Sequence, residues 1–415
     1  MSKSLHLKHS VVTTLALLFV LMLLISNVSW AQTPAPEANT VIGQPDFNSN
    51  TPGIGAQSLN FPLGITGDNA GGIYVADRNN HRVLFFATGD AVADRVYGQS
   101  DNFNTYIVNF DGIGGSGAPS ANTLNMPTVV AVDRENGLYV ADRDNHRILY
   151  FANDNDSIAD RVYGQFGNFG TNPANNDGAG GSGIPSAENI GVFSLGLIVD
   201  NDGGLYVADS SNNRVLFFAN DGDTVADRVY GQFGSLITGV VNNDGTGVTS
   251  SPSADNFNFP RGMTLDADGG LYICDRENHR VLFFANDGDT TADRVYGQFG
   301  SFTTNAANNT GDPSADSLFK PRAISADASG GVYIADTSNN RILYFANDGD
   351  TTADAVYGQS GSFTTNAVNN DGTGNEGTPN AGNLNLPQGV FIEQSGRLYI
   401  SDTGNNRILV FGAEE

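Results

Sequence analysis

The 415-residue chain is poor in cysteine, in positive charge and in charged residues of either sign. Cys274 is its single cysteine, so no disulfide can form within the chain. Lys and Arg number 20 against 45 Asp and Glu, which gives a formal net charge of −25. Nucleic-acid affinity depends on Lys and Arg that neutralise phosphates, so we expect no nucleic-acid partner. Charged residues make up 16% of the chain, and the Ala-, Glu-, Lys- and Leu-rich stretches typical of helices are missing, which favours short strands joined by turns.

Familiar catalytic signatures are missing as well. The chain after residue 31 contains no Gly-x-Ser-x-Gly elbow, no His-Glu-x-x-His motif and no phosphate-binding loop with Lys. Lys320 is the one Lys in this part, so a Schiff-base mechanism would depend on it alone. The sequence therefore predicts no catalytic residues and favours a binding protein over an enzyme.

The first 31 residues have the pattern of a secretory signal peptide. Lys3 and Lys8 precede an apolar run over residues 11–25, and small residues at Ser29 and Ala31 predict cleavage after Ala31. The run is short for a membrane span, which needs about 20 residues, although a retained anchor stays an alternative. We expect residues 1–31 to be a signal peptide, residues 32–38 a short linker, and the mature chain to be secreted or extracytoplasmic without membrane insertion.

A repeat dominates the remaining chain. The phrase Tyr-Val-Ala-Asp or a close variant occurs six times, an Arg follows each Asp by five residues, and most repeats end on Val-Tyr-Gly-Gln. Self-similarity of this kind indicates a repeat architecture. Each repeat contains four strand-like runs, and six four-stranded sheets around an axis can cover one another's faces. We therefore predict an all-β fold over residues 39–415, a six-bladed β-propeller of four-stranded antiparallel blades. The Asp–Arg pairs are Asp77–Arg82, Asp142–Arg147, Asp209–Arg214, Asp275–Arg280, Asp336–Arg341 and Asp402–Arg407.

The two ends of the repeat array are complementary. The last repeat stops at Phe411, after its third strand-like run. Val41-Ile42-Gly43-Gln44 matches the closing phrase but has no repeat before it. We expect this N-terminal strand to complete the last blade, because that pairing removes two open sheet edges.

The turns Asp77-Arg78-Asn79-Asn80-His81-Arg82 and Asp142-Arg143-Asp144-Asn145-His146-Arg147 resemble the NHL repeat, which is named for its Asn-His-Leu signature. Here Val or Ile stands at the Leu position, and three repeats have Asn in place of His. The resemblance covers nearly all of the chain after residue 31. It implies a six-bladed propeller, in agreement with the repeat count, and implies little about activity because a fold does not determine function.

Long loops between the blades are the first candidate for a binding surface. In this strand order the Asp-to-Arg turns share one face with the inter-blade loops. Binding residues often lie on loops that a rigid scaffold carries, although loops of low hydrophobicity also serve as solvated spacers. The loops are residues 100–123, 167–189, 234–256, 301–317 and 361–383.

Within the turns, Asp and Arg occur in every repeat and are expected to be structural. Asp tends to bond the backbone of the turn that it begins, and Arg can bridge carbonyls or the Asp. Residues that differ between turns are the better contact candidates. His81, His146 and His279 occupy equivalent positions on separate blades, so we expect no zinc site from them. The binding candidates are Arg78, His81, Asp144, His146, Glu277 and His279.

The opposite face carries a second acidic motif, Asn-Asp-Gly-Asp followed by another Asp. Calcium takes six to eight oxygen ligands, and such a loop supplies some of them. Hairpin turns also select Asn, Asp and Gly for backbone reasons alone. We expect no metal and no cofactor, with calcium as the possible exception. Its weak candidate ligands are Asp221, Asp223, Asp227, Asp287, Asp289 and Asp293.

Two classes of function follow. The first is a non-enzymatic module that binds a protein, peptide or glycan through its long loops. The alternative comes from resemblance, because some NHL-related propellers are lyases and the similar six-bladed lactonases hydrolyse sugar lactones, both with a metal held by inner strands. The inner strand-like runs of this chain contain no His and no carboxylate, which argues against that alternative. The nearest acids, at or near the following turns, are Asp68, Asp133, Asp200, Asp266, Asp327 and Glu393.

Overall fold

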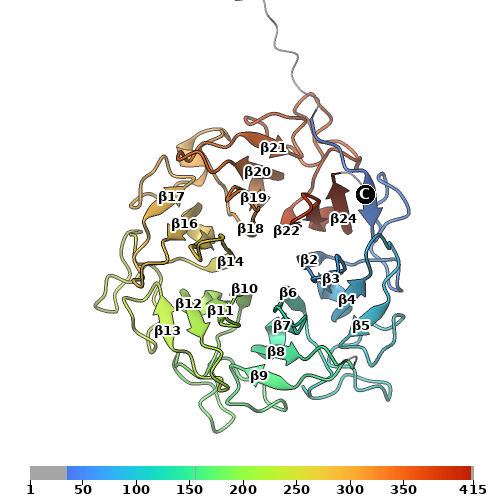
Figure 1. The fold of residues 1–415 in the computed structure, drawn as a ribbon, viewed down its shortest axis with the longest axis vertical. Helices are drawn as coiled ribbons and strands as arrows, with labels where there is room; N and C mark the ends of the chain where they lie inside the picture. Colours follow the sequence, from blue (N-terminus) through green and yellow to red (C-terminus); the bar gives the residue numbers. More distant parts are fainter. Residues whose placement is uncertain (1–34, 155, 413–415) are drawn as a thin grey trace, which may run out of the picture. The chain divides into compact units, whose positions relative to one another are not determined.

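The computed structural model describes residues 35–154 and 156–412. The predicted signal peptide and residues 32–34 of the predicted linker therefore lie outside the described residues. The described residues from Pro36 onward form one compact unit, a ring of six sheets around a central axis (Figure 1). In the described part of the chain, no helix has the length and apolarity needed to cross a membrane.

Each blade is a four-stranded antiparallel sheet, as predicted. The first contains β2 (Pro62–Gly67), β3 (Ile73–Asp77), β4 (Arg82–Phe86) and β5 (Arg95–Tyr97), and the second β6 (Pro127–Val132), β7 (Leu138–Asp142), β8 (Arg147–Phe151) and β9 (Arg161–Tyr163). The third contains β10 (Ser194–Val199), β11 (Leu205–Asp209), β12 (Arg214–Phe218) and β13 (Arg228–Tyr230), and the fourth β14 (Pro260–Leu265), β15 (Leu271–Asp275), β16 (Arg280–Phe284) and β17 (Arg294–Tyr296). The fifth contains β18 (Ile324–Ala326), β19 (Val332–Asp336), β20 (Arg341–Phe345) and β21 (Ala355–Tyr357). The sixth contains β22 (Pro387–Ile392), β23 (Leu398–Asp402), β24 (Arg407–Phe411) and β1 (Thr40–Ile42).

The hydrophobic core lies between neighbouring blades. One cluster joins Tyr74 and Tyr97 of the first blade to Val140, Leu149 and Phe151 of the second. The rings of Tyr97 and Phe151 meet edge to face, with centroids 5.2 Å apart. A four-stranded sheet therefore buries its apolar face against the next sheet, which is why the blades are stable as a ring rather than singly.

The innermost strands approach one another closely at glycine. A Cβ added to Gly196 would lie 2.2 Å from the carbonyl oxygen of Arg261 on the next blade, and one added to Gly389 would lie 2.2 Å from that of Leu63. Real Cβ atoms do not come this near to backbone, so these positions exclude larger residues. The close approach draws the inner strands around a narrow central channel.

The predicted closure is confirmed, since β1 pairs antiparallel with β24, with Val41 opposite Leu409. Side chains reinforce the joint. Nε2 of Gln44 donates to the backbone carbonyl of Asn406 at 2.9 Å, and Arg407 donates to the carbonyl of Phe47. In the first blade, Gln99 makes the matching bond to the carbonyl of His81, so the N-terminal segment replaces the missing fourth strand in detail.

Removing the closing strand should open the ring. We expect a chain that begins at Asn48 to melt roughly 5–15 °C below a chain that begins at Pro36, because only the former lacks the β1–β24 pairing. Differential scanning calorimetry of the two chains measures this. Equal melting temperatures would contradict closure by β1.

Candidate functional site: the loop face and the channel mouth

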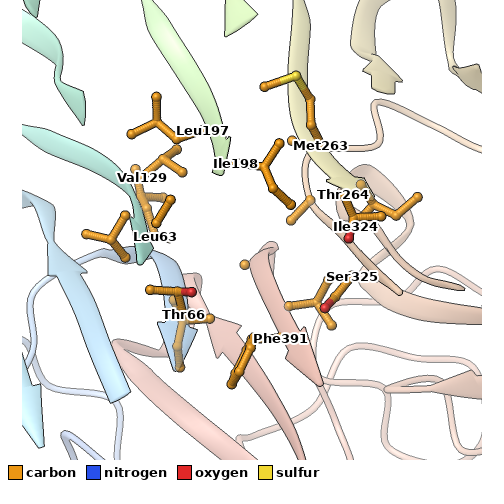
Figure 2. Close-up of a pocket in the computed structure, with 18 of the residues that line it drawn as sticks. Leu63, Thr66, Val129, Leu197, Ile198, Met263, Thr264, Ile324, Ser325 and Phe391 are labelled. Carbon is orange, nitrogen blue, oxygen red and sulfur yellow. The ribbon is translucent and has the colours of Figure 1, made fainter. Parts of the chain in front are cut away.

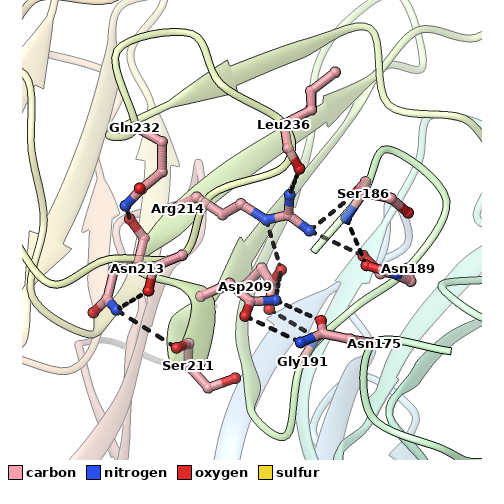
Figure 3. Close-up of polar contacts among 12 residues, drawn as sticks. Asn175, Ser186, Asn189, Gly191, Asp209, Ser211, Asn213, Arg214, Gln232 and Leu236 are labelled. Atoms are coloured by element: carbon pink, nitrogen blue, oxygen red, sulfur yellow. Dashed lines mark hydrogen bonds and ion pairs between the residues drawn. The ribbon is translucent and has the colours of Figure 1, made fainter. Parts of the chain in front are cut away.

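Each Asp-to-Arg turn is built around a buried ion pair. In the third blade, Nε of Arg214 lies 2.8 Å from Oδ2 of Asp209, and neither side chain is exposed (Figure 3). The remaining guanidinium nitrogens donate to backbone carbonyls, Nη1 to Leu236 and Nη2 to Ser186 and Asn189. Ser186 and Asn189 end the loop before the blade and Leu236 begins the loop after it. One guanidinium thus fixes two long loops at their bases.

All six blades repeat this arrangement, with Nε–Oδ2 distances of 2.7 or 2.8 Å. The structural role expected for the pair is confirmed, but the expected bond from Asp to the backbone of its own turn is wrong. Oδ1 of Asp209 instead accepts the N–H of Gly191 in the preceding loop, and Oδ2 accepts from the Asn212 side chain. The turn is closed by its own backbone, so the carboxylate is free to hold the loop.

Loss of one guanidinium should be costly. We expect Arg214→Met to reduce the free energy of unfolding by roughly 3–5 kcal/mol, because Asp209 would remain buried without its counter-charge. Urea unfolding measures the effect. Arg228→Met, which changes a partly exposed arginine of β13, should cost less than about 1 kcal/mol and is the matched control.

The turns fall into two classes. In the first, second and fourth blades the residue after Asp is Arg and the residue before the final Arg is His, whereas the other blades have Ser or Thr and Asn. The His or Asn is left-handed in every turn, with φ of 52–54°. Nδ1 of His81 accepts the N–H of Met126, and Nδ1 of His279 accepts the N–H of Lys320. At the same position in the third blade, Oδ1 of Asn213 accepts the N–H of Phe259.

These bonds assign structural roles to the predicted histidines. His81 and His279 are buried and tie each turn to the entry of the next blade. Nδ1 of His146 lies 3.1 Å from the carbonyl oxygen of Val192. Asp144 forms an ion pair with Arg143 at 3.3 Å, and Glu277 pairs with Arg276 and, at 3.4 Å, with Lys320.

His279 predicts a loss of stability in acid. Burial, then the charges of Lys320 and Arg276, lower its pKa to about 4. The neutral form is favoured in the folded state, so this stabilisation is complete above the unfolded pKa of about 6.5 and is lost as the pH falls toward 4. We expect His279→Asn to reduce the drop in unfolding free energy between pH 7.5 and pH 5 by about 1 kcal/mol. The same drop in both proteins would show that Nδ1 is not the acceptor.

The central channel is lined by the six inner strands and encloses about 280 Å³. Figure 2 shows that Leu63, Leu197, Ile198 and Phe391 surround it, with hydroxyls of Thr66, Thr264 and Ser325 among them. Its described lining contains no His and no carboxylate. The lining instead includes Arg261, Arg322 and Gln388 at the end where the strands begin, on the loop face.

A second cavity of about 220 Å³ forms the mouth of the channel on this face. Of the predicted binding residues, Arg78 lies in it, and the others do not line it. Arg261 and Arg322 were not among the residues predicted from the sequence. Both follow a proline, at a position where other blades have Leu63, Thr128 or Gln388. The cavity is lined by Phe61, Leu63, Arg78, Thr128, Arg143, Phe193, Phe259, Arg261, Arg322 and Gln388.

The acids that follow the inner strands lie in turns at the end of the channel away from the loop face. Oδ1 of Asp200 accepts the N–H groups of Asp202 and Gly204, and Asp266 does the same for its own turn. The calcium candidates behave alike: Asp221 and Asp223 accept N–H groups within their loop, and Asp227 accepts that of Ala219. Within residues 35–154 and 156–412, no group of three His, Cys, Asp or Glu is placed to hold a metal ion.

Comparison with known proteins identifies the repeat. The NHL repeat model matches residues 59–86, 124–151, 257–284 and 384–411, while no curated protein sequence matches the chain. Among solved structures, a protein of unknown function from Bacteroides thetaiotaomicron aligns with a TM-score of 0.55 at 15% identity, covering 92% of this chain and 76% of its own. An auxiliary nutrient binding protein from the same organism gives 0.52 at 15%, covering 86% and 70%. A gluconolactonase from Xanthomonas campestris gives 0.49 at 13%, covering 91% and 99%.

The four matched segments fall on the first, second, fourth and sixth blades. The third and fifth blades have the same strand order and the same buried Asp–Arg pair. The likeness to the solved structures concerns the fold alone. This chain is an NHL-repeat protein folded as a six-bladed β-propeller.

Proposed function

We propose that this protein is an exported, non-enzymatic binding module that engages a protein, peptide or glycan through its loop face. One observation carries the proposal. Phe166, Phe233 and Phe299 stand at equivalent positions where three of the long loops begin, and their side chains are exposed by 40%, 50% and 70%. Each has a left-handed backbone, with φ of 49–51°.

The fold does not require an aromatic residue at these positions. A bulky side chain in the left-handed region is strained, and Ser100 and Ser360 occupy the same place and conformation in the first and fifth blades. Exposed aromatic side chains are enriched where proteins contact partners. Strain combined with exposure at three equivalent sites is therefore better explained by contact than by folding.

The long loops that begin at these residues are suited to binding a partner. Their bases are fixed by the buried guanidiniums, so little ordering cost remains when a partner binds. Their tips, residues 111–118, 177–184, 244–251 and 371–378, are almost entirely exposed. The fourth loop, residues 301–317, is shorter and lacks such a tip, and Phe299 at its start is the most exposed of the three phenylalanines.

The proposal includes secretion, no nucleic-acid partner and no obligatory cofactor. The acidic composition and the pattern of residues 1–31 support these parts. The alternative of a metal-dependent lyase or lactonase-like hydrolase has less support, because the described channel lining offers no imidazole or carboxylate ligand. The acidic loops of the opposite face are the place where calcium would be sought first.

The test compares the two faces. Residues 32–415 are screened on glycan and peptide arrays, and each hit is measured with the triple variant Phe166→Ser, Phe233→Ser, Phe299→Ser. We expect at least about tenfold weaker binding, since buried aromatic anchors dominate interface energy. Because Ser is the native residue in two blades, the melting temperature should not fall.

A matched control changes exposed apolar residues on the opposite face. Val92, Ile158 and Val225 occupy equivalent positions in the hairpin loops there, and Thr291 and Thr352 replace them in the fourth and fifth blades. Their triple change to Thr should leave binding unaltered. Loss of binding in this control but not in the Phe variant, or no hit on either array, would contradict a loop-face binding module.

A further inference from the structure

The channel mouth contains arginines without partners. Arg261 and Arg322 follow prolines at the entries of the fourth and fifth blades and line both the mouth and the channel. The Nε atom of each is buried and has no hydrogen-bond partner. Neither side chain forms an ion pair with a described residue. Arg261 rests on the ring of Phe259, 5.1 Å from its centroid.

Further positive charge surrounds them. Arg78 lies 5.4 Å from the ring centroid of Phe61, and Arg143 lies 4.3 Å from that of Phe193. Burial, followed by the charges of Arg276, Arg78 and Arg143, lowers the pKa of Arg322 to about 9. Burial, followed by the charge of Arg322 and those of the same three arginines, lowers the pKa of Arg261. The cations thus destabilise one another in a chain whose net charge is −25.

The repeat shows that the fold does not need these charges. Leu63, Thr128 and Gln388 occupy the position of Arg261 and Arg322 in other blades. In place of Arg78, Arg143 and Arg276, the third, fifth and sixth blades have Ser210, Thr337 and Thr403. Their hydroxyls donate to the carbonyl of Pro260, Pro387 and Pro62, at 2.5–2.7 Å, and so join neighbouring blades. Arg261 and Arg322 have no counter-charge and are costly to remove from water, and Ser or Thr in place of Arg78 and Arg143 would join the blades better.

We propose that the channel mouth binds a small organic acid, whose carboxylate lies between Arg261 and Arg322 and whose apolar body packs among Phe61, Phe193 and Phe259. The planar guanidinium offers paired donors that fit a carboxylate. The three rings and Leu63 provide an apolar wall, and the mouth continues into the mainly apolar channel behind it. This site lies at the axis and goes beyond the proposed function, which concerns the loops.

The probe is 2-naphthoate, with neutral 2-naphthamide as its counterpart of the same shape and inorganic sulfate as a bare anion. Isothermal titration calorimetry should show one saturable naphthoate site per chain, at least about tenfold weaker binding of naphthamide, and no saturation by sulfate below about 1 mM. The naphthoate affinity should also fall as salt rises, because part of it is electrostatic.

Two variants taken from the chain's own repeat separate a binding role from a structural one. Arg261→Leu and Arg322→Gln introduce the residues of the first and sixth blades. Each should weaken naphthoate binding at least about tenfold and raise the melting temperature of the free protein by about 1–3 °C, since an unpaired buried charge is removed. Arg228→Gln, on the side of the opposite channel mouth, should change naphthoate binding little.

Each contrary result overturns the site. No saturable naphthoate binding up to about 1 mM would refute it, as would equal binding of naphthamide. Variants that melt lower and still bind naphthoate would show that the arginines are structural. None of these results bears on partner binding by the loops, which the Phe variants test separately.

Discussion

The buried Asp–Arg pair is the interaction on which this propeller depends. Its guanidinium donates hydrogen bonds to the carboxylate at the end of the strand before the turn and to backbone carbonyls of the loops on both sides of the blade. A buried ion pair by itself contributes little net stability, because desolvation offsets the attraction. Here the pair satisfies backbone groups that the long loops would otherwise leave unpaired. The fold can therefore carry loops of about twenty residues without leaving them loose at the base.

The same constraint explains why the turns vary where they do. Asp and Arg form hydrogen bonds with the loops, and the left-handed His or Asn accepts a hydrogen bond from the entry of the next blade. The residue after Asp is Ser or Thr in three blades, where its hydroxyl joins the next blade, and Arg in the others, of which Arg78 and Arg143 line the channel mouth. The positions that remain free for function are thus at the axis and on the outer loops, with the structural network between them.

The sequence predicted most of the fold, and there are physical reasons why it did not predict the arginines of the channel mouth or the exposed phenylalanines. Blade number, strand order and closure by β1 followed from a phrase that repeats, since Val41 to Gln44 carries the fourth-strand signal out of place. Arg261 and Arg322 were overlooked because a proline-led strand start looks like a loop, and their significance depends on neighbours from other blades. The exposure and strain of Phe166 depend on the backbone conformation after Gly164 and Gln165, which the sequence pattern alone does not reveal.

The two ends of the central channel carry charges of opposite sign. At the end away from the loops it meets Asp200, Asp266, Asp327 and Glu393, of which the aspartates serve the turns that follow the inner strands. At the loop face it meets unpaired arginines. Salt screens charges at distances beyond about 10 Å, so the arginines attract an anion only near the mouth. The arginines therefore cannot act by long-range steering. They act by contact, and they admit an anion from the loop face while the carboxylates oppose its entry from the other side.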